Sequence, residues 1–373
     1  MKMKLILFLA IIPILNSQVG PAKELHRNPP RTWALTNATI HTEPGKTVYD
    51  GTVVIRDGII KSVGKNVRIP NQASILDMDG KHIYAGFIES WLDVNTVKKD
   101  TSLQAHWNPN MRAYLNATDL FHPKEKSLTD LRKVGFTTAH IAPKGGIFQG
   151  TSGLVQLGQT PKILSNNVAQ VLEYVSGGWQ SPAYPTSLLG IIAFMRQGLI
   201  DAEWYDKSQK ILTKYPDNNE PIQKDRSLAT IANALNQKQP FIFRTSNELY
   251  IDRSANIAEE FNLNLWVKGN GYEYRRIDEM PASFMIVPIN FPAKPDVDDP
   301  HNALQYSTEQ LKHWDMAPDN LAKLTKAKMK VALTSDGLKT KNDFRKNLSR
   351  AIRRGLPEKE ALAAITTNPA KEF

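Results

Sequence analysis

The feature that most constrains this chain is a repeated alternation, after Lys81, of short apolar runs and amphipathic stretches. Short apolar runs are typical of buried strands, and apolar residues at helical spacing predict helices. The predicted strands are Ile83–Ile88, Thr137–Ile141, Phe241–Phe243, Leu265–Val267, Ser283–Val287 and Val331–Thr334. The predicted helices are Lys126–Val134, Leu228–Asn236, Ile251–Phe261 and Ala317–Ala327. Repeated βα units of this extent favour an α/β fold with a TIM-like (β/α)8 barrel over an open sheet.

A different pattern precedes this region. Residues alternate between apolar and polar in Trp33–Ile40, Gly51–Arg56 and Ile59–Val63, which predicts strands of a half-buried sheet. Asp57-Gly58 separates the last two strands and is a strong hairpin signal, and Ser74–Met78 is a further predicted strand. The expected organisation is a leader at residues 1–17, an extended lead-in at 18–32, part of a small β-sandwich at 33–82 and the barrel at 83–373.

The first residues predict export. Lys2 and Lys4 precede the apolar run Leu5–Leu15, which is too short for an ordinary membrane span of roughly 20 residues. A basic start followed by such a run is typical of a secretory signal peptide. We therefore expect a periplasmic or extracellular protein without membrane association after cleavage. A retained anchor and a buried strand are the alternatives.

Composition excludes several kinds of site. The chain of 373 residues has no cysteine, which excludes disulfides, thiolate metal sites and a cysteine nucleophile. Its formal charge of +10 comes mostly from basic residues scattered among acidic ones. The one dense basic stretch, Lys339–Arg354, has its cations at helical spacing opposite Phe344 and Leu348, which favours a solvated helix face over a polyanion-binding surface. No nucleic-acid partner is therefore expected.

Several segments occur in the order found in one known family. They are Gly51–Gly64, Asp79–Glu89, Leu131–Thr138, Ala317–Leu321 with Val331–Asp336, and Arg354–Ala370. In these segments the chain resembles the amidohydrolase superfamily, most of all its imidazolonepropionase and metal-dependent dipeptidase-like branch. The resemblance implies a (β/α)8 barrel with a small β-sandwich built from both chain ends. It also implies hydrolysis of amide or other C–N bonds with one or two divalent metals.

The resemblance places metal ligands where this chain has other residue types. The His-x-His motif of the family falls on Trp91 and Asp93, and a further ligand histidine falls on Arg244. An indole offers no lone pair to a metal, and a guanidinium is a permanent cation. The next ligand strand contains Lys268 and Asn270 in place of histidine. We therefore expect an impaired metal site, with Trp91, Arg244, Lys268 and Asn270 lining the pocket.

Asp336 is the position that matches the family pattern, in which this aspartate is a metal ligand and general base. It is our candidate catalytic residue. If the site is functional, Zn²⁺ or another divalent metal would be held by Asp336, Asp93 and His140, the last being the one histidine on a predicted barrel strand. The alternatives are a core or rim role for His140, and an ion pair between Asp336 and Arg244 with Asp93 competing.

Two other segments are open to interpretation. The glycine-rich run Lys144–Gly153 lacks the Gly-Lys-Ser/Thr of a phosphate-binding loop and is either a pocket wall or a cluster of turns. In the family, the helix with Asn368–Ala370 is followed by strands that complete the sandwich, whereas this chain ends at Phe373. We therefore expect a fragment of a longer protein, and a downstream amidohydrolase domain is one candidate partner.

Two functions remain open. The first is an exported hydrolase that acts on C–N bonds of dipeptides or non-peptide amides. The second is a non-catalytic barrel that binds a small amide or peptide-like ligand, or that scaffolds an intact amidohydrolase domain. The replaced metal ligands favour the second function for this segment, and the family resemblance favours the first for the parent protein.

Overall fold

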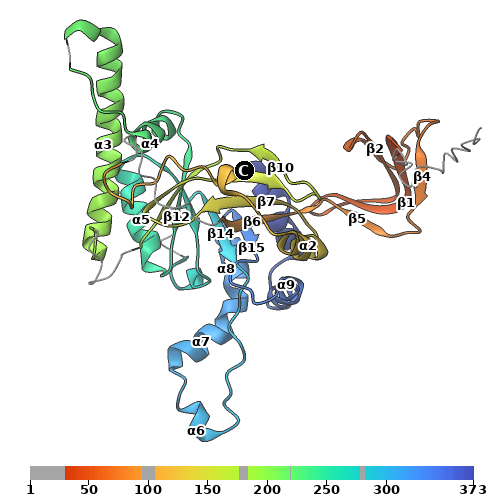
Figure 1. Cartoon of the computed structure of the whole chain (residues 1–373). Helices are drawn as coiled ribbons and strands as arrows, with labels where there is room; N and C mark the ends of the chain where they lie inside the picture. The colour runs from red at the N-terminus through yellow and green to blue at the C-terminus, as the bar shows by residue number, and fades with distance from the viewer. Residues whose placement is uncertain (1–29, 95–105, 176–183, 219, 278–281) are drawn as a thin grey trace, which may run out of the picture. The chain divides into compact units, whose positions relative to one another are not determined.

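The computed structural model describes residues 30–94, 106–175, 184–218, 220–277 and 282–373. The predicted leader at 1–17 and most of the lead-in at 18–32 lie outside these residues. The described residues divide into two compact units (Figure 1). The first contains the described residues up to Ile40 and Thr47–Ile83, and the second contains His41–Lys46 and the described residues from Tyr84 to Phe373. In the described residues, no helix combines the length and apolar character that a membrane span needs.

The first unit is built on a sheet in the order β3-β2-β1-β4, with β5 also paired to β1. Its strands are β1 (Thr32–Glu43), β2 (Lys46–Arg56), β3 (Ile59–Gly64), β4 (Ser74–Asp77) and β5 (His82–Tyr84). Strands β2 and β3 are antiparallel and are joined at Asp57 and Gly58. Both residues have positive φ angles, 51° and 77°, as a tight two-residue hairpin turn requires. The hairpin prediction is confirmed.

The second unit contains two sheets in mixed parallel and antiparallel pairing. One sheet has the order β10-β9-β7-β6, and the other has the order β15-β14-β13-β12-β11-β8. Strands β6 and β7 are parallel, and so are β11 to β15 in sequence. The bounds are β6 Phe87–Val94, β7 Phe136–Pro143, β8 Phe148–Thr151, β9 Gly153–Gln156, β10 Lys162–Ser165, β11 Gln170–Glu173, β12 Pro240–Arg244, β13 Asn264–Lys268, β14 Phe284–Pro288 and β15 Val331–Thr334.

Helices separate most of the parallel strands, as the alternating pattern predicts. They are α1 Ala117–Leu120, α2 Glu125–Val134, α3 Leu188–Lys214, α4 Arg226–Asn236, α5 Leu249–Glu260, α6 Pro300–Ala303, α7 Thr308–Met316, α8 Asn320–Lys326, α9 Asp343–Arg353, α10 Glu358–Ile365 and α11 Thr367–Glu372. Short 3-10 turns are η1 Pro216–Asn218, η2 Glu273–Arg275 and η4 Ala317–Asp319. The fold is therefore mixed α/β. The described strands of the second unit form two separate hydrogen-bonded sheets.

Two predicted elements need correction. The predicted strand Ile83–Ile88 is wrong, because β5 ends at Tyr84 and β6 begins at Phe87. Gly86 lies between them, and a Cβ there would be 2.1 Å from the hydroxyl oxygen of Thr137, so the close approach to β7 requires glycine. The predicted helix Ala317–Ala327 begins as the 3-10 turn η4 and becomes α-helical only at Asn320.

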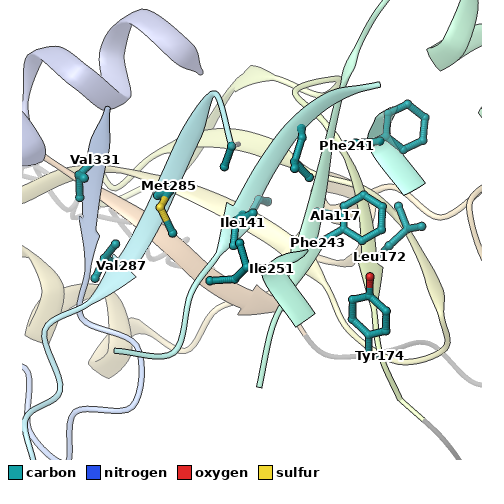
Figure 2. Close-up of a cluster of buried hydrophobic side chains, with 14 of the residues drawn as sticks. Ala117, Ile141, Leu172, Tyr174, Phe241, Phe243, Ile251, Met285, Val287 and Val331 are labelled. Atoms are coloured by element: carbon teal, nitrogen blue, oxygen red, sulfur yellow. The ribbon is translucent and has the colours of Figure 1, made fainter. Parts of the chain in front are cut away.

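Parallel strands in the second unit are apolar on both faces. Phe241 and Phe243 of β12 pack in a large cluster against the helices, together with Met285 and Val287 of β14 (Figure 2). The residue between the two phenylalanines, Ile242, belongs to a second buried cluster. The other buried members of that cluster are Trp91, Ala142, Val168, Ala169, Val171, Trp266, Phe284, Ile286 and Ala332. Burial on both faces explains why these strands read as continuous apolar runs.

The core packing yields a stability prediction. Phe136 of β7 is fully buried and meets the ring of Phe344 of α9 edge-on at a centroid distance of 5.0 Å. Phe136→Ala should lower the free energy of unfolding by about 3–5 kcal/mol through lost contacts and a cavity. The control Leu189→Ala, on an exposed part of α3, should change it by less than about 0.5 kcal/mol. Urea unfolding followed by tryptophan fluorescence measures both, and equal effects would contradict the assignment of Phe136 to the core.

Candidate functional site

Charged side chains gather where the parallel strands of the second unit end. Glu173, Arg244 and Lys268 are the last residues of β11, β12 and β13, and their Cα atoms are paired in register across these neighbouring strands. Asp93 lies near the end of β6, and Asp336 follows β15 by two residues. We call these five residues the strand-end network. The carboxyl ends of parallel strands meet at one edge of a sheet, which is where ligands bind in α/β folds.

Asp93 and Arg244 form the most complete ion pair of the network. The Arg244 guanidinium donates two hydrogen bonds to Asp93, from Nη1 to Oδ1 at 2.9 Å and from Nη2 to Oδ2 at 3.2 Å. The guanidinium lies over the Trp91 ring, with 5.2 Å between Cζ and the centroid, and the indole Nε1 donates to Asp93 Oδ1 at 2.9 Å. Arg244 Nε is also 3.7 Å from an oxygen of Glu173.

Lys268 and Asp336 form the second pair. Lys268 Nζ is 3.0 Å from Asp336 Oδ2 and donates to the Gly269 carbonyl at 3.1 Å. Burial alone would raise the pKa of Asp336. The opposing charge and hydrogen bond of Lys268, with further attraction from Arg244 and Lys341, hold that pKa below its ordinary value of 3.8. Asp336 is therefore a carboxylate at neutral pH and a weak base.

The ion pair considered between Asp336 and Arg244 is corrected by this geometry. Arg244 makes its bidentate contact with Asp93, and Asp336 pairs with Lys268 instead. The physical reason is the match between the planar guanidinium fork and the two oxygens of one carboxylate, which Asp93 presents at hydrogen-bond distance.

Beside the network, a buried glutamate connects β6 with the end of β15. Glu89 accepts hydrogen bonds from the Ser335 backbone N–H at 3.1 Å, from the Ser335 hydroxyl and from the Trp91 N–H at 3.2 Å. Lys341 Nζ donates to the same Ser335 hydroxyl at 2.8 Å. Thr334 Oγ1 donates to the Trp91 carbonyl at 3.1 Å. Burial raises the pKa of Glu89 despite these hydrogen bonds and the charge of Lys341.

His140 lies in the core and outside the ion pairs. Its ring is fully buried, stacks on Phe373 at 4.3 Å and meets Trp91 edge-on at 5.7 Å. Nδ1 lies 3.0 Å from the Ser90 carbonyl oxygen. A carbonyl oxygen only accepts hydrogen bonds, so the tautomer that makes this hydrogen bond has its proton on Nδ1. Nε2 has no hydrogen-bond partner among the described residues. Burial, opposed by the Ser90 contact, lowers the pKa of His140 to about 4.

The three residues considered as metal ligands are not assembled as a ligand set. Among the described residues, no group of three or more His, Asp or Glu side chains is placed to hold a metal ion. Asp93 already accepts from Arg244 and Trp91, and Asp336 from Lys268. The groups beside these two carboxylates are the cations of Arg244 and Lys268 and the indole N–H of Trp91. None of these three groups can donate a lone pair to a metal. The residues present therefore do not fit a divalent metal.

The glycine-rich segment contributes two side chains to the site. Lys144 Nζ is 3.5 Å from Asp93 Oδ2, and the Gln149 amide donates to Glu173. Gly150 has a φ of 126°, and a Cβ there would be 2.5 Å from the Leu115 carbonyl oxygen. The segment is thus fitted closely against neighbouring backbone, and its polar residues extend the strand-end network.

Asn270, predicted to line the pocket, takes part in a separate loop network. Its backbone N–H donates to Glu273 Oε1 at 2.6 Å, and its side-chain oxygen accepts from the Tyr272 N–H at 3.1 Å. No hydrogen bond in the described structure joins Asn270 to the strand-end network. Its pocket role stays a prediction.

Three functional candidates were not predicted, namely Glu173, Ser335 and Lys341. Lys144 and Gln149 belong to the glycine-rich segment that was considered as a pocket wall. Glu173 ends a strand of only four residues, β11, which was not predicted. A signal was available for Ser335, because it directly precedes Asp336 after a buried strand.

The basic stretch Lys339–Arg354 also has partners within the chain, since Arg345 donates to the Val134 carbonyl and Arg354 pairs with Asp319.

Comparison with known proteins supplies a fold relationship. No protein-family model matches the chain, and no curated protein sequence does so either. Among solved structures, an amidohydrolase from Thermotoga maritima MSB8 has a TM-score of 0.70 at 20% identity, over 91% of this chain and 88% of that one. A second structure described as an amidohydrolase has a TM-score of 0.50 at 12% identity, over 91% and 87% of the two chains. The predicted resemblance is confirmed at the level of the fold.

Glu89 yields a pH prediction. A raised carboxyl pKa stabilises the fold at low pH, and this contribution is lost as pH rises from the ordinary value of 4.5 through the folded value. The variant Glu89→Gln has no charge at any pH, so its free energy of unfolding should rise relative to that of the wild type as pH increases through this interval. The relative gain should be about 1.4 kcal/mol for each unit by which the Glu89 pKa is raised. Urea unfolding of both proteins from pH 4 to 8 measures the difference. A difference that is constant or falls with pH would contradict burial as the dominant cause.

His140 yields a second pH prediction. Because the pKa of His140 is lowered in the folded protein, its contribution to the free energy of unfolding is fully present above pH 6.5. This contribution is lost as pH falls toward 4. Over this interval the free energy of unfolding should fall by up to about 3 kcal/mol through His140. Histidine ring signals in NMR, assigned by their loss in His140→Gln, should show a titration midpoint near 4. A midpoint near 6.5 would place this ring in contact with solvent.

Proposed function

Starting from the amidohydrolase fold that this chain has, we propose that it is an exported amidohydrolase-like protein whose metal-dependent hydrolysis is impaired at this centre. The single observation that carries the proposal is the bidentate contact of Arg244 with Asp93. By the resemblance, both residues stand where relatives have histidine ligands. Metal-dependent hydrolysis needs a Lewis acid with an open position and a base that accepts a proton from water.

The carboxylate that matches the family base is also weakened. Lys268, at 3.0 Å, stabilises the charged form of Asp336 and so lowers its affinity for a proton. A general base is most effective when its pKa lies near the working pH. Asp336 therefore falls short both as a base and as a free metal ligand.

The finer architecture belongs to the same proposal. We infer that the two sheets of the second unit close into a (β/α)8 barrel, with the amino-terminal sheet forming part of a β-sandwich. The hydrogen bonds from Ser335 to Glu89 and from Thr334 to the Trp91 carbonyl support closure between β15 and β6. Export is supported by the basic and apolar leader pattern of residues 1–17.

A second candidate function is a non-catalytic barrel that binds a small amide or peptide-like ligand. The observation that favours it is the partial exposure of the network, since the side chains of Asp336 and Asp93 are 38% and 26% exposed. Charges of both signs at one strand edge are suited to a ligand with an amino and a carboxylate group. Scaffolding of an intact amidohydrolase domain in a longer protein is compatible with the same centre.

Metal content and hydrolysis test the proposed impairment. The purified chain should contain no stoichiometric zinc, manganese or iron by elemental analysis. It should not hydrolyse a panel of dipeptides and N-acyl amino acids, with or without added Zn²⁺ or Mn²⁺. Because the charges occupy the metal position, Asp336→Ala should leave both results unchanged. Near-stoichiometric metal that is lost in Asp336→Ala, together with hydrolysis, would overturn the proposal.

A further inference from the structure

We propose that Arg244 and Lys268 are built-in cations that take the charge-balancing place of a divalent metal at the strand-end network. This inference rests on the proposed function and adds a physical reason why the centre is complete without a metal. The network has three carboxylates, Asp93, Glu173 and Asp336, all within ion-pair distance of one of the two cations.

Arg244 has the geometry of a fixed bridging charge. Its side chain is 14% exposed and contacts Asp93 through two nitrogens and Glu173 through Nε. The ring of Trp91 lies under the guanidinium and restricts its movement. A divalent ion between Asp93 and Glu173 would have to displace this tethered charge. A guanidinium is a permanent cation in proteins, so Arg244 cannot lose its proton to make room.

Lys268 completes the compensation on the neighbouring strand. Its side chain is only 9% exposed and has Asp336 as its carboxylate partner. Since Arg244 and Lys268 are paired in register on β12 and β13, the two cations stand side by side along the strand ends. A third cation, Lys144, approaches Asp93 at 3.5 Å, but its side chain is 59% exposed and so is weakly held.

The consequence is a cation site that the wild type masks. Among the described residues, loss of the Arg244 charge leaves Asp93 with one cation, the exposed Lys144, beside the Trp91 N–H, and removes the cation beside Glu173. Unpaired carboxylates that are partly buried repel each other and attract hard cations. Arg244→Met should therefore be less stable than the wild type and should gain affinity for divalent ions. The wild type should show no such affinity.

Thermal unfolding of the full chain tests this. The wild type, Arg244→Met and the charge-preserving Arg244→Lys are compared in EDTA and in millimolar Mg²⁺, Ca²⁺, Mn²⁺ or Zn²⁺. The unfolding midpoint of Arg244→Met should fall by several degrees in EDTA and recover with at least one ion. The midpoints of the wild type and Arg244→Lys should not respond. A folded Arg244→Met that responds to none of the ions overturns the inference, as does a wild type that loses stability in EDTA.

A double variant keeps the inference testable if Arg244→Met does not fold. Asp93→Asn with Arg244→Met removes both charges, so this protein should be more stable than Arg244→Met alone and should not respond to the ions. If the double variant is as unstable as the single one, charge compensation is not the role of Arg244. A different result would contradict the proposed function. If the metal-free wild type hydrolysed amides, the proposed impairment would be wrong, whereas the inference about Arg244 and Lys268 would still hold.

Discussion

The ion pair between Asp93 and Arg244 is the interaction on which the carboxyl edge of the second unit depends. It joins β6, in one sheet, to β12, in the other, across 151 positions of sequence. Both side chains are mostly removed from solvent, at 26% and 14% exposure. Loss of one partner from a partly buried pair should cost stability, because the other charge is left with weaker compensation. The edge therefore tolerates changes to both partners better than a change to one.

The contact between β6 and β15 has a different physical basis. Glu89 is fully buried, and in the described part of the chain no ion pair joins it to a cation, because the Ser335 hydroxyl lies between it and Lys341. The serine hydroxyl accepts from the lysine and donates to the glutamate, so a charge-assisted chain of hydrogen bonds replaces a direct ion pair. Burial keeps the Glu89 pKa raised even so. The stability contributed at the β6–β15 junction should therefore fall as pH rises through the raised pKa of Glu89.

Much of the fold could be predicted because its strands are buried on both faces. The prediction Val331–Thr334 coincides with β15, and Phe241–Phe243 and Leu265–Val267 lie within β12 and β13. The long helix α3 was missed, since apolar residues such as Ile200 and Trp204 are exposed on it and obscure the helical periodicity. Closure of the two sheets into a barrel was predicted from the length of the βα region and stays a proposal.

The site was predictable in part of its membership and not in its pairing. The resemblance to the amidohydrolase superfamily selected Asp93, Arg244, Lys268 and Asp336, whereas Glu173 was missed. Which carboxylate meets which cation depends on side-chain direction and on strand order, and neither is contained in local sequence. The sequence suggested an ion pair between Asp336 and Arg244. In the structure Asp336 pairs with Lys268 instead, which lies on β13, the strand paired in register with β12.

Trp91 explains how a charged edge can rest on an apolar interior. Its indole N–H donates to Asp93 and its ring faces the Arg244 guanidinium, while the rest of the ring is buried against His140. A tryptophan body excludes water beneath the ion pair, and the lower local dielectric strengthens the attraction between the charges. A histidine at this position would be smaller and would leave the underside of Arg244 open to water. Trp91 is thus well suited to support a charged edge above a buried core.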